Sequence, residues 1–140
     1  MNWSDDDVAR FWSKVDKTGT DGCWLWVGSI DSSGYGQIKI KGRQVLAHRM
    51  GFMLSGQTIE PGKPLDHLCR VRHCVNPTHL ESVTARENTL RGMGPAGVNA
   101  RKTHCKRGHP FDDDNTGMQA KGRYCKACYV AWLAGRRKAA

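Results

Sequence analysis

Residues 64–92 gather side chains that bind metals or move protons. They are Asp66, His67, Cys69, Cys74, His79 and Asn88. Thiolate and neutral imidazole are typical zinc ligands, and Cys69, Cys74 and His79 follow one another at intervals of five residues. They could close around one ion, but a structural zinc site needs four ligands. We therefore expect zinc here, with its fourth ligand supplied from elsewhere in the chain.

The other three residues of this stretch suit a different site. Carboxylate and amide oxygens, as on Asp66 and Asn88, bind hard divalent cations. An imidazole such as that of His67 can act as a general base near neutral pH. The sequence thus predicts one metal that holds structure and a second that takes part in chemistry.

A second set of candidate zinc ligands lies near the end of the sequence. Cys105 and His109 are followed by Cys125 and Cys128, a spacing close to that of structural zinc ribbons. His104 could replace His109, and two disulfides or free thiols are the alternatives to a metal. A tail of this size has almost no core, so zinc would supply most of its folding free energy, about 10 kcal/mol.

The tail site uses three of the six cysteines and leaves Cys23, Cys69 and Cys74. Together with His79 these form a second set of three cysteines and one histidine, so we expect two structural Zn²⁺ ions. Cys23 lies more than forty residues before Cys69, and only a fold that brings the two together can use it. His73 or a water molecule could otherwise complete the site.

The elements that must position these residues can be predicted from local patterns. Ser4 and the acidic residues after it indicate a helix start, and the segment 45–56 is predicted as a strand end passing into a helix that stops at Gly56. The residues after Cys23 favour a strand that forms an antiparallel hairpin with residues 35–42 across a DSSG turn.

The region of the first ligand set is expected to fold as strand, zinc-bound loop, strand and helix. The second strand is HLESVT, and a capping signal formed by Thr84 and Glu87 precedes the helix ARENTLRG. This order is β-β-α, with His67 at the end of the first strand and Asn88 on the helix. The fold class is therefore small α+β, stabilised by zinc.

A basic surface is expected on the predicted hairpin. Ile38 and Ile40 alternate with polar residues, and a two-stranded ribbon can enter the major groove of DNA. The candidate DNA-binding residues of this ribbon are Gln37, Lys39, Lys41 and Arg43. A solvated outer face is the competing interpretation. The net charge of +9 and the pI near 9.5 make an anionic polymer the expected partner, although such a charge can also serve solubility alone.

The expected compartment is a cytoplasm. No apolar run approaches the roughly 20 residues that span a bilayer, and the acidic beginning of the sequence is unlike a signal peptide. Five of the six histidines fall within five residues of a cysteine, which favours metal ligation over disulfides.

The run HLCRVRHCVNPTHLE, with Asp66 before it and Asn88 after it, resembles HNH endonucleases of the ββα-metal superfamily, in particular the His-Cys box homing endonucleases. The resemblance implies that His67 is the general base, that Asn88 and Asp66 hold a catalytic Mg²⁺ or Mn²⁺, and that Cys69, Cys74, His79 and the upstream Cys23 bind zinc. Small proteins of this type resemble phage-encoded nucleases, which would act in the cytoplasm of a bacterial host.

The implied activity is metal-dependent hydrolysis of phosphodiester bonds in double-stranded DNA, leaving a 5′-phosphate and a 3′-hydroxyl. Arg49, Arg70 and Arg72 would contact phosphate, although Arg70 and Arg72 could equally be solvated loop residues. The oligomeric state, monomer or homodimer, and the choice between nicking and double-strand cutting stay open. A zinc-containing DNA-binding regulator without catalysis is the main alternative, and a zinc-scaffolded interaction adaptor is a third.

Four segments are expected along the chain. They are a lead-in helix (1–22), a zinc-stapled nuclease core (23–92), a linker (93–103) and a C-terminal zinc module with a basic helix (104–140).

Overall fold

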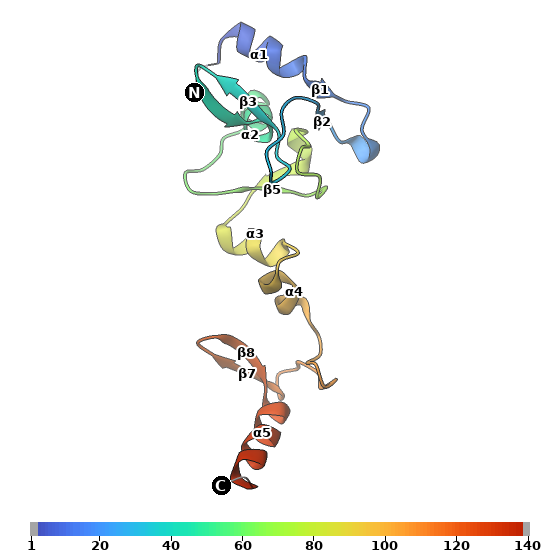
Figure 1. The fold of residues 1–140 in the computed structure, drawn as a ribbon, viewed down its shortest axis with the longest axis vertical. Helices are drawn as coiled ribbons and strands as arrows, with labels where there is room; N and C mark the ends of the chain where they lie inside the picture. Colours follow the sequence, from blue (N-terminus) through green and yellow to red (C-terminus); the bar gives the residue numbers. More distant parts are fainter. Residues whose placement is uncertain (1–2, 139–140) are drawn as a thin grey trace. The chain divides into compact units, whose positions relative to one another are not determined.

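The computed structural model describes residues 3–138 as a small α+β protein with short antiparallel strand pairs. The chain divides into two compact units, Met1–Asn88 and Thr89–Ala140, and each is described by itself (Figure 1). Residues 1–2 and 139–140, at the outer ends of the expected first and last segments, lie outside the described residues. No helix within residues 3–138 has the length and apolar character needed to cross a membrane.

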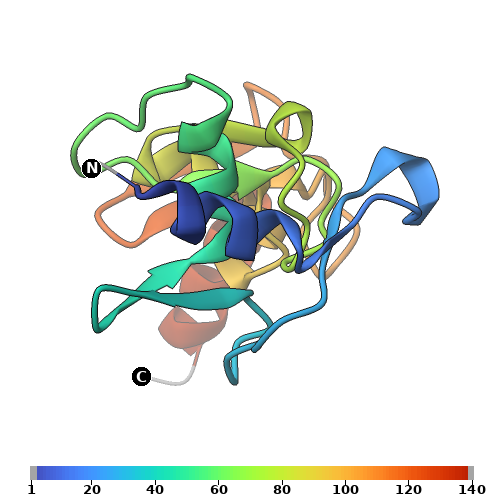
Figure 2. The same cartoon turned by 90° about the horizontal axis from the view of Figure 1, so that it is seen from above.

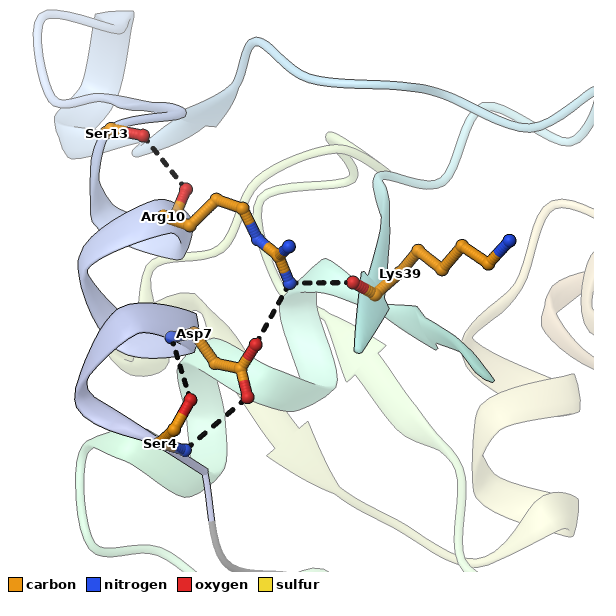
Figure 3. Close-up of polar contacts among 5 residues, drawn as sticks. All are labelled: Ser4, Asp7, Arg10, Ser13 and Lys39. Atoms are coloured by element: carbon orange, nitrogen blue, oxygen red, sulfur yellow. Dashed lines mark hydrogen bonds and ion pairs between the residues drawn. The ribbon is translucent and has the colours of Figure 1, made fainter. Parts of the chain in front are cut away.

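The predicted N-terminal helix is confirmed as α1, Asp5–Trp12. The Ser4 side chain accepts from the Asp7 backbone N–H at 3.2 Å, and the Asp7 carboxylate accepts from the Ser4 backbone N–H at 3.4 Å, forming a capping box. Arg10 bonds both Asp7 and the carbonyl of Lys39, as Figure 3 shows. These contacts tie the helix to the neighbouring hairpin.

The first unit continues through short strands to a second helix. Its elements are β1 (Val15–Asp16), η1 (Thr20–Gly22), β2 (Leu25–Trp26), β3 (Gln37–Ile40), β4 (Arg43–Leu46) and α2 (Ala47–Leu54). In Figure 2, α1 passes across the β3–β4 hairpin. The helix α2 ends before Gly56, which has a φ of 85°, so the predicted stop is confirmed.

The predicted pairing of the hairpin is wrong. β2 pairs with β1, and β3 pairs with β4, with Lys39 opposite Gln44. Lys41 and Gly42 both have positive φ, 46° and 79°, which is the geometry of a two-residue hairpin turn whose twist matches the strands. This tight turn closes the ladder on the C-terminal side of β3. The earlier turn supports a short pairing without a ladder: an isolated bridge between Ile30 and Gly36, and a hydrogen bond from the Gln37 N–H to the Ser29 carbonyl at 2.8 Å.

The core of the first unit lies between α1, β2, β3 and α2. It consists of Phe11, Trp26, Ile38, Ile40, Ala47, Met50 and Val75. The alternation predicted for β3 is confirmed, because Ile38 and Ile40 are buried while Lys39 is exposed. A smaller cluster joins Phe52 of α2 to Leu65 and Leu80, so α2 packs against the next strand pair.

That strand pair completes the predicted β-β-α order. β5 (Leu65–His67) pairs antiparallel with β6 (Leu80–Ser82), with η2 (Pro77–His79) in the connecting loop and α3 (Ala85–Arg91) after β6. The Thr84 backbone N–H and hydroxyl both donate to the Glu87 carboxylate at 2.8 and 2.7 Å, and the Glu87 N–H donates to Thr84. The predicted helix cap is therefore present.

The second unit contains two helices and one hairpin. Its elements after α3 are α4 (Pro95–Arg101), β7 (Thr116–Gln119), β8 (Gly122–Cys125) and α5 (Lys126–Lys138). The segment 93–103 was expected to be a linker without regular structure, but most of it is α4, with Gly94 at the N-cap and Pro95 in the first turn. Both clusters of buried hydrophobic residues found in the described chain belong to the first unit.

Candidate active site and metal-ligand clusters

The first set of four predicted zinc ligands comes together in the first unit. One ligand atom from each of Cys23, Cys69, Cys74 and His79 lies within 4.8 Å of the others. His79 Nδ1 is 3.6 Å from Cys23 Sγ and 3.7 Å from Cys74 Sγ. Ligands held at about 2.0–2.3 Å from a zinc ion stand about 3.5–3.8 Å apart along the edges of a tetrahedron. The cluster therefore has dimensions that could hold zinc.

Backbone pairing brings the distant Cys23 to this cluster. Trp26 N–H donates to the His73 carbonyl at 2.9 Å, and Val75 N–H donates to the Trp24 carbonyl at 2.8 Å. The segment around β2 thus runs antiparallel beside the loop that carries Cys74. Burial raises the pKa of the Cys23 thiol to about 12, and the neighbouring thiols Cys69 and Cys74 add to this effect. A cation at the cluster would be needed to keep these sulfurs ionised.

The second ligand set lies entirely in the second unit. Cys105, His109, Cys125 and Cys128 also place their ligand atoms within 4.8 Å of one another. His109 Nδ1 is 3.6 Å from Cys105 Sγ and 3.3 Å from Cys128 Sγ. His109 fills this position rather than the alternative His104, whose Nδ1 lies 3.0 Å from the Thr103 hydroxyl. The cluster could hold a second zinc ion.

Backbone and amide donors surround the sulfur atoms of the second cluster. Cys125 Sγ accepts from the Cys128 N–H at 3.4 Å and lies 3.4 Å from the Asn115 amide nitrogen. Burial raises the pKa of Cys125, but these hydrogen bonds outweigh it and lower the pKa to about 6. Cys125 is therefore suited to bind as thiolate.

His67 ends β5 and is buried, with its Nε2 3.1 Å from the carbonyl oxygen of Cys74. A carbonyl can only accept, so Nε2 is the donor and carries the proton of the neutral ring. The lone pair then lies on Nδ1. Burial lowers the pKa of His67, although the hydrogen bond to Cys74 and the charge of Asp66 oppose this shift. The ring is therefore held neutral, with one nitrogen able to accept a proton.

Two aromatic rings lie next to His67, and the sequence analysis gave neither of them a role at the site. The His48 ring meets the His67 ring edge to face at 4.8 Å, and the Tyr35 ring is 5.9 Å from it. His48 is buried, and its Nδ1 has no hydrogen-bond partner within residues 3–138. Burial, together with the nearby His67, lowers the pKa of His48 to about 3. In the sequence, His48 stands directly before Arg49, a predicted phosphate contact.

Asp66 precedes His67 and is also buried. Its Oδ1 accepts from the Arg70 guanidinium at 2.7 Å. Arg70 has a φ of 61°, so the chain turns sharply immediately after Cys69 of the first metal-ligand cluster. The carboxylate is thus paired with a cation at the place where a metal ion was expected.

Asn88 lies half-buried on α3, and its backbone N–H donates to the Thr84 carbonyl at 3.0 Å. Among the described residues, no hydrogen bond joins its side chain to Asp66 or His67. A cation shared by Asp66 and Asn88 stays a prediction.

The predicted DNA-binding residues differ in how far they are engaged within the protein. Lys39, Lys41 and Arg43 are exposed. Gln37 donates to Asp31 at 3.1 Å and accepts from Gln44, so its amide is already engaged.

The arginines near the site are also partly engaged. Arg72 donates to the Ser33 carbonyl at 2.7 Å and lies over the Tyr35 ring. Arg49 is half-buried on α2. Together with Arg70, both remain candidate phosphate contacts.

Comparison with known proteins finds a family that resembles the segment holding this site. Residues 45–90 match a family model described as HNH endonuclease. Protein 2.8 of Escherichia phage T7 is 30% identical over 101 residues, which cover 71% of this chain and 64% of that protein. Protein 7.7 of the same phage is 30% identical over 67 residues, or 48% of this chain and 52% of that protein.

The chain therefore spans between half and two thirds of the length of these relatives. No solved structure matches it. The matched segment contains α2, β5, β6 and nearly all of α3, and with them every residue predicted to take part in the chemistry. Residues 45–90 are therefore similar to the HNH endonuclease family, and the relatives that match the chain are phage proteins.

Proposed function

We propose that this protein is a DNA endonuclease that hydrolyses phosphodiester bonds with His67 as the general base. The observation that carries the proposal is the oriented, buried His67, which lies within the segment matching the HNH family. The proposed products are a 5′-phosphate and a 3′-hydroxyl. A phage nuclease of this kind would work on DNA in the cytoplasm of its bacterial host.

The proton-transfer step follows from the tautomer of His67. Because Nε2 donates to the Cys74 carbonyl, Nδ1 is the atom that takes the proton from the attacking water. The lowered pKa of the ring keeps this nitrogen unprotonated near neutral pH. Once Nδ1 is protonated, the Asp66 carboxylate, one residue away, stabilises the imidazolium charge.

The ring of His67 needs a fixed direction for this role. The Cys74 carbonyl accepts from Nε2 and so fixes that edge of the His67 ring. The rings of His48 and Tyr35 lie beside the His67 ring and limit its rotation. Cys74 also belongs to the first zinc-ligand cluster. We therefore infer that His48 is a positioning residue, and that the structural metal aligns the base through Cys74.

Two predicted site residues carry the oxygen ligands that a hard divalent cation prefers. Asp66 offers a carboxylate and Asn88 an amide oxygen, which are the ligand types that Mg²⁺ prefers. Bound there, Mg²⁺ or Mn²⁺ would supply Lewis acidity to the phosphate and to the leaving 3′-oxygen. Before the cation binds, Arg70 neutralises the Asp66 carboxylate. Arg70 would then be released toward the phosphate of the substrate.

The proposal is tested with Asn88→Ala and Asn88→Asp in the full chain. Asn88→Ala should reduce metal-dependent cutting of supercoiled plasmid by at least about a hundredfold, because an oxygen ligand is lost. Asn88→Asp keeps an oxygen in place and should retain cutting. Zinc content and DNA affinity should be the same in both variants and in the wild type.

Two outcomes would contradict this assignment. Undiminished cutting by Asn88→Ala would remove Asn88 from the metal site. Tight DNA binding by the wild-type protein, without cutting in Mg²⁺ or Mn²⁺, would support the zinc-containing regulator instead.

A further inference from the structure

The positive charge of the protein is concentrated in its second unit. Residues 89–140 contain 11 Lys and Arg residues and 3 Asp, a formal net charge of +8. Residues 1–88 contain 11 Lys and Arg residues and 10 Asp and Glu, a net charge of +1. The unit that holds the candidate active site is thus almost neutral, although its expected substrate is a polyanion.

The second unit also contains a groove of about 820 Å³. Its walls come from α4, the second metal-ligand cluster and the β7–β8 hairpin. Four cationic side chains line it: Lys102, Lys106, Lys121 and Arg123. None of the acidic residues Asp112, Asp113 and Asp114 is among its lining residues. Outside the metal-ligand cluster, no acidic side chain lines the groove, and its Lys and Arg residues are all cationic.

The apolar part of the groove is open to a ligand. Phe111 and Met118 are both lining residues, and Met118 is 75% exposed. The Arg123 guanidinium lies 4.3 Å from the Phe111 ring centroid and donates to the carbonyls of Asn99 and Lys102. Arg123 is thus held in place before any ligand arrives, which lowers the entropy cost of binding an anion.

We propose that this groove is a binding site for the sugar–phosphate backbone of duplex DNA, and that it supplies most of the protein's affinity for DNA. The lysines would contact phosphates, and the deoxyribose faces would lie on Phe111 and Met118. The proposal deepens the proposed function, on which it rests for the choice of DNA as the polyanion. The DNA held here stays close to the candidate active site because both units belong to one chain.

The second metal-ligand cluster has a defined part in this site. Cys105, Cys125 and Cys128 are lining residues of the groove and belong to the cluster. A zinc ion bound there would therefore fix the shape of the groove.

The test replaces three groove lysines in the full-length, zinc-loaded protein: Lys102→Gln, Lys106→Gln and Lys121→Gln. The matched control removes the same charge from the same unit outside the groove, with Arg107→Gln, Lys126→Gln and Arg137→Gln. Affinity for a short DNA duplex is measured over a range of salt concentrations. Zinc content and circular dichroism establish that both triple variants are folded.

Each phosphate contact contributes about 0.9 to the slope of log affinity against log salt concentration. We expect the groove variant to lose about 2 to 3 units of slope, and the control to lose less than about 1. Equal slopes for the two triple variants would overturn the proposal. It would also be overturned if the groove variant lost binding to poly-glutamate but not to DNA, since the groove would then take an acidic protein.

Cleavage separates this proposal from the proposed function. The groove variant should need a higher DNA concentration than the triple control variant for half-maximal cutting of supercoiled plasmid. One outcome is that the wild-type protein never cuts DNA and the groove variant binds DNA more weakly than the wild type. The groove assignment would then stand, and the proposed nuclease activity would be refuted. A second outcome is that cutting depends on Asn88 while the groove variant keeps the wild-type salt slope. The nuclease activity would then stand, and the groove assignment would be refuted.

Discussion

The two metal-ligand clusters have the same chemistry, three cysteines and one histidine, but different surroundings. In the first unit, Cys74 and its neighbour Val75 are fully buried beside a core that contains Phe11, Trp26 and Met50. In the second unit, no comparable apolar cluster is found within the described residues. The first cluster therefore shapes a loop on a body that has its own core, whereas the second takes the place of a core.

This difference extends to what each cluster positions. The first holds Cys74, whose carbonyl accepts from His67, so it orients a candidate base. The second lines a basic groove. A structural metal can thus align one proton acceptor in one unit and set the shape of a whole binding surface in the other.

Loss of one ligand from each cluster should give the largest contrast. Cys128→Ser should unfold most of the second unit, because zinc would supply about 10 kcal/mol or more of its folding free energy. Cys23→Ser should disturb residues 68–79 but leave α1 and the β3–β4 hairpin folded. Amide hydrogen exchange, read segment by segment, measures both effects. Retained protection of β7 and β8 in Cys128→Ser would refute the view that the metal replaces a core.

Acid should destabilise the first unit through a group that the second unit lacks. His48 has a folded pKa of about 3 against 6.5 when exposed, so the unfolded state binds a proton that the folded state does not. The contribution of neutral His48 to the free energy of unfolding is therefore fully present above pH 6.5. It falls by about 1.4 kcal/mol per pH unit as the pH drops from 6.5 toward 3.

The matched variant for this effect is His48→Phe, which keeps an aromatic ring and cannot titrate. Urea unfolding of the first unit at pH 6.5 and pH 5 should show a smaller acid loss in His48→Phe, by about 2 kcal/mol. Both proteins also lose stability in acid because their candidate zinc ligands become protonated. Subtracting the acid loss of His48→Phe from that of the wild type cancels this shared part. Equal losses in both proteins would mean that His48 is not buried as a neutral ring.

Features set by neighbouring residues could be predicted from the sequence. The Ser4 and Thr84 caps, the alternation of Ile38 and Ile40, and the β-β-α order all depend on spacings of a few residues. The grouping of zinc ligands followed from counting cysteines and histidines. The helix at residues 95–101 also had a local start signal, Gly94 followed by Pro95. It was not predicted because the segment has no helical period of apolar residues.

Features that depend on long-range packing could not be predicted. The choice of partner for β3 was decided by the Lys41–Gly42 turn, because a two-residue turn with positive φ closes a ladder better than the longer turn before it. The contact of His48 with His67 joins α2 to β5, and no local pattern reports it. The unequal charge of the two units could be read from the sequence. The groove that gathers four of the cationic side chains depends on the folded second unit and could not.

The central claim is that His67 activates water for DNA hydrolysis. Its most direct test is cutting of supercoiled plasmid by zinc-loaded wild-type protein and His67→Ala in Mg²⁺, with and without added imidazole, at equal zinc content. Loss of a general base should lower the rate about 10²–10⁴-fold, and imidazole should restore part of it. Cutting by His67→Ala at the wild-type rate would contradict the account.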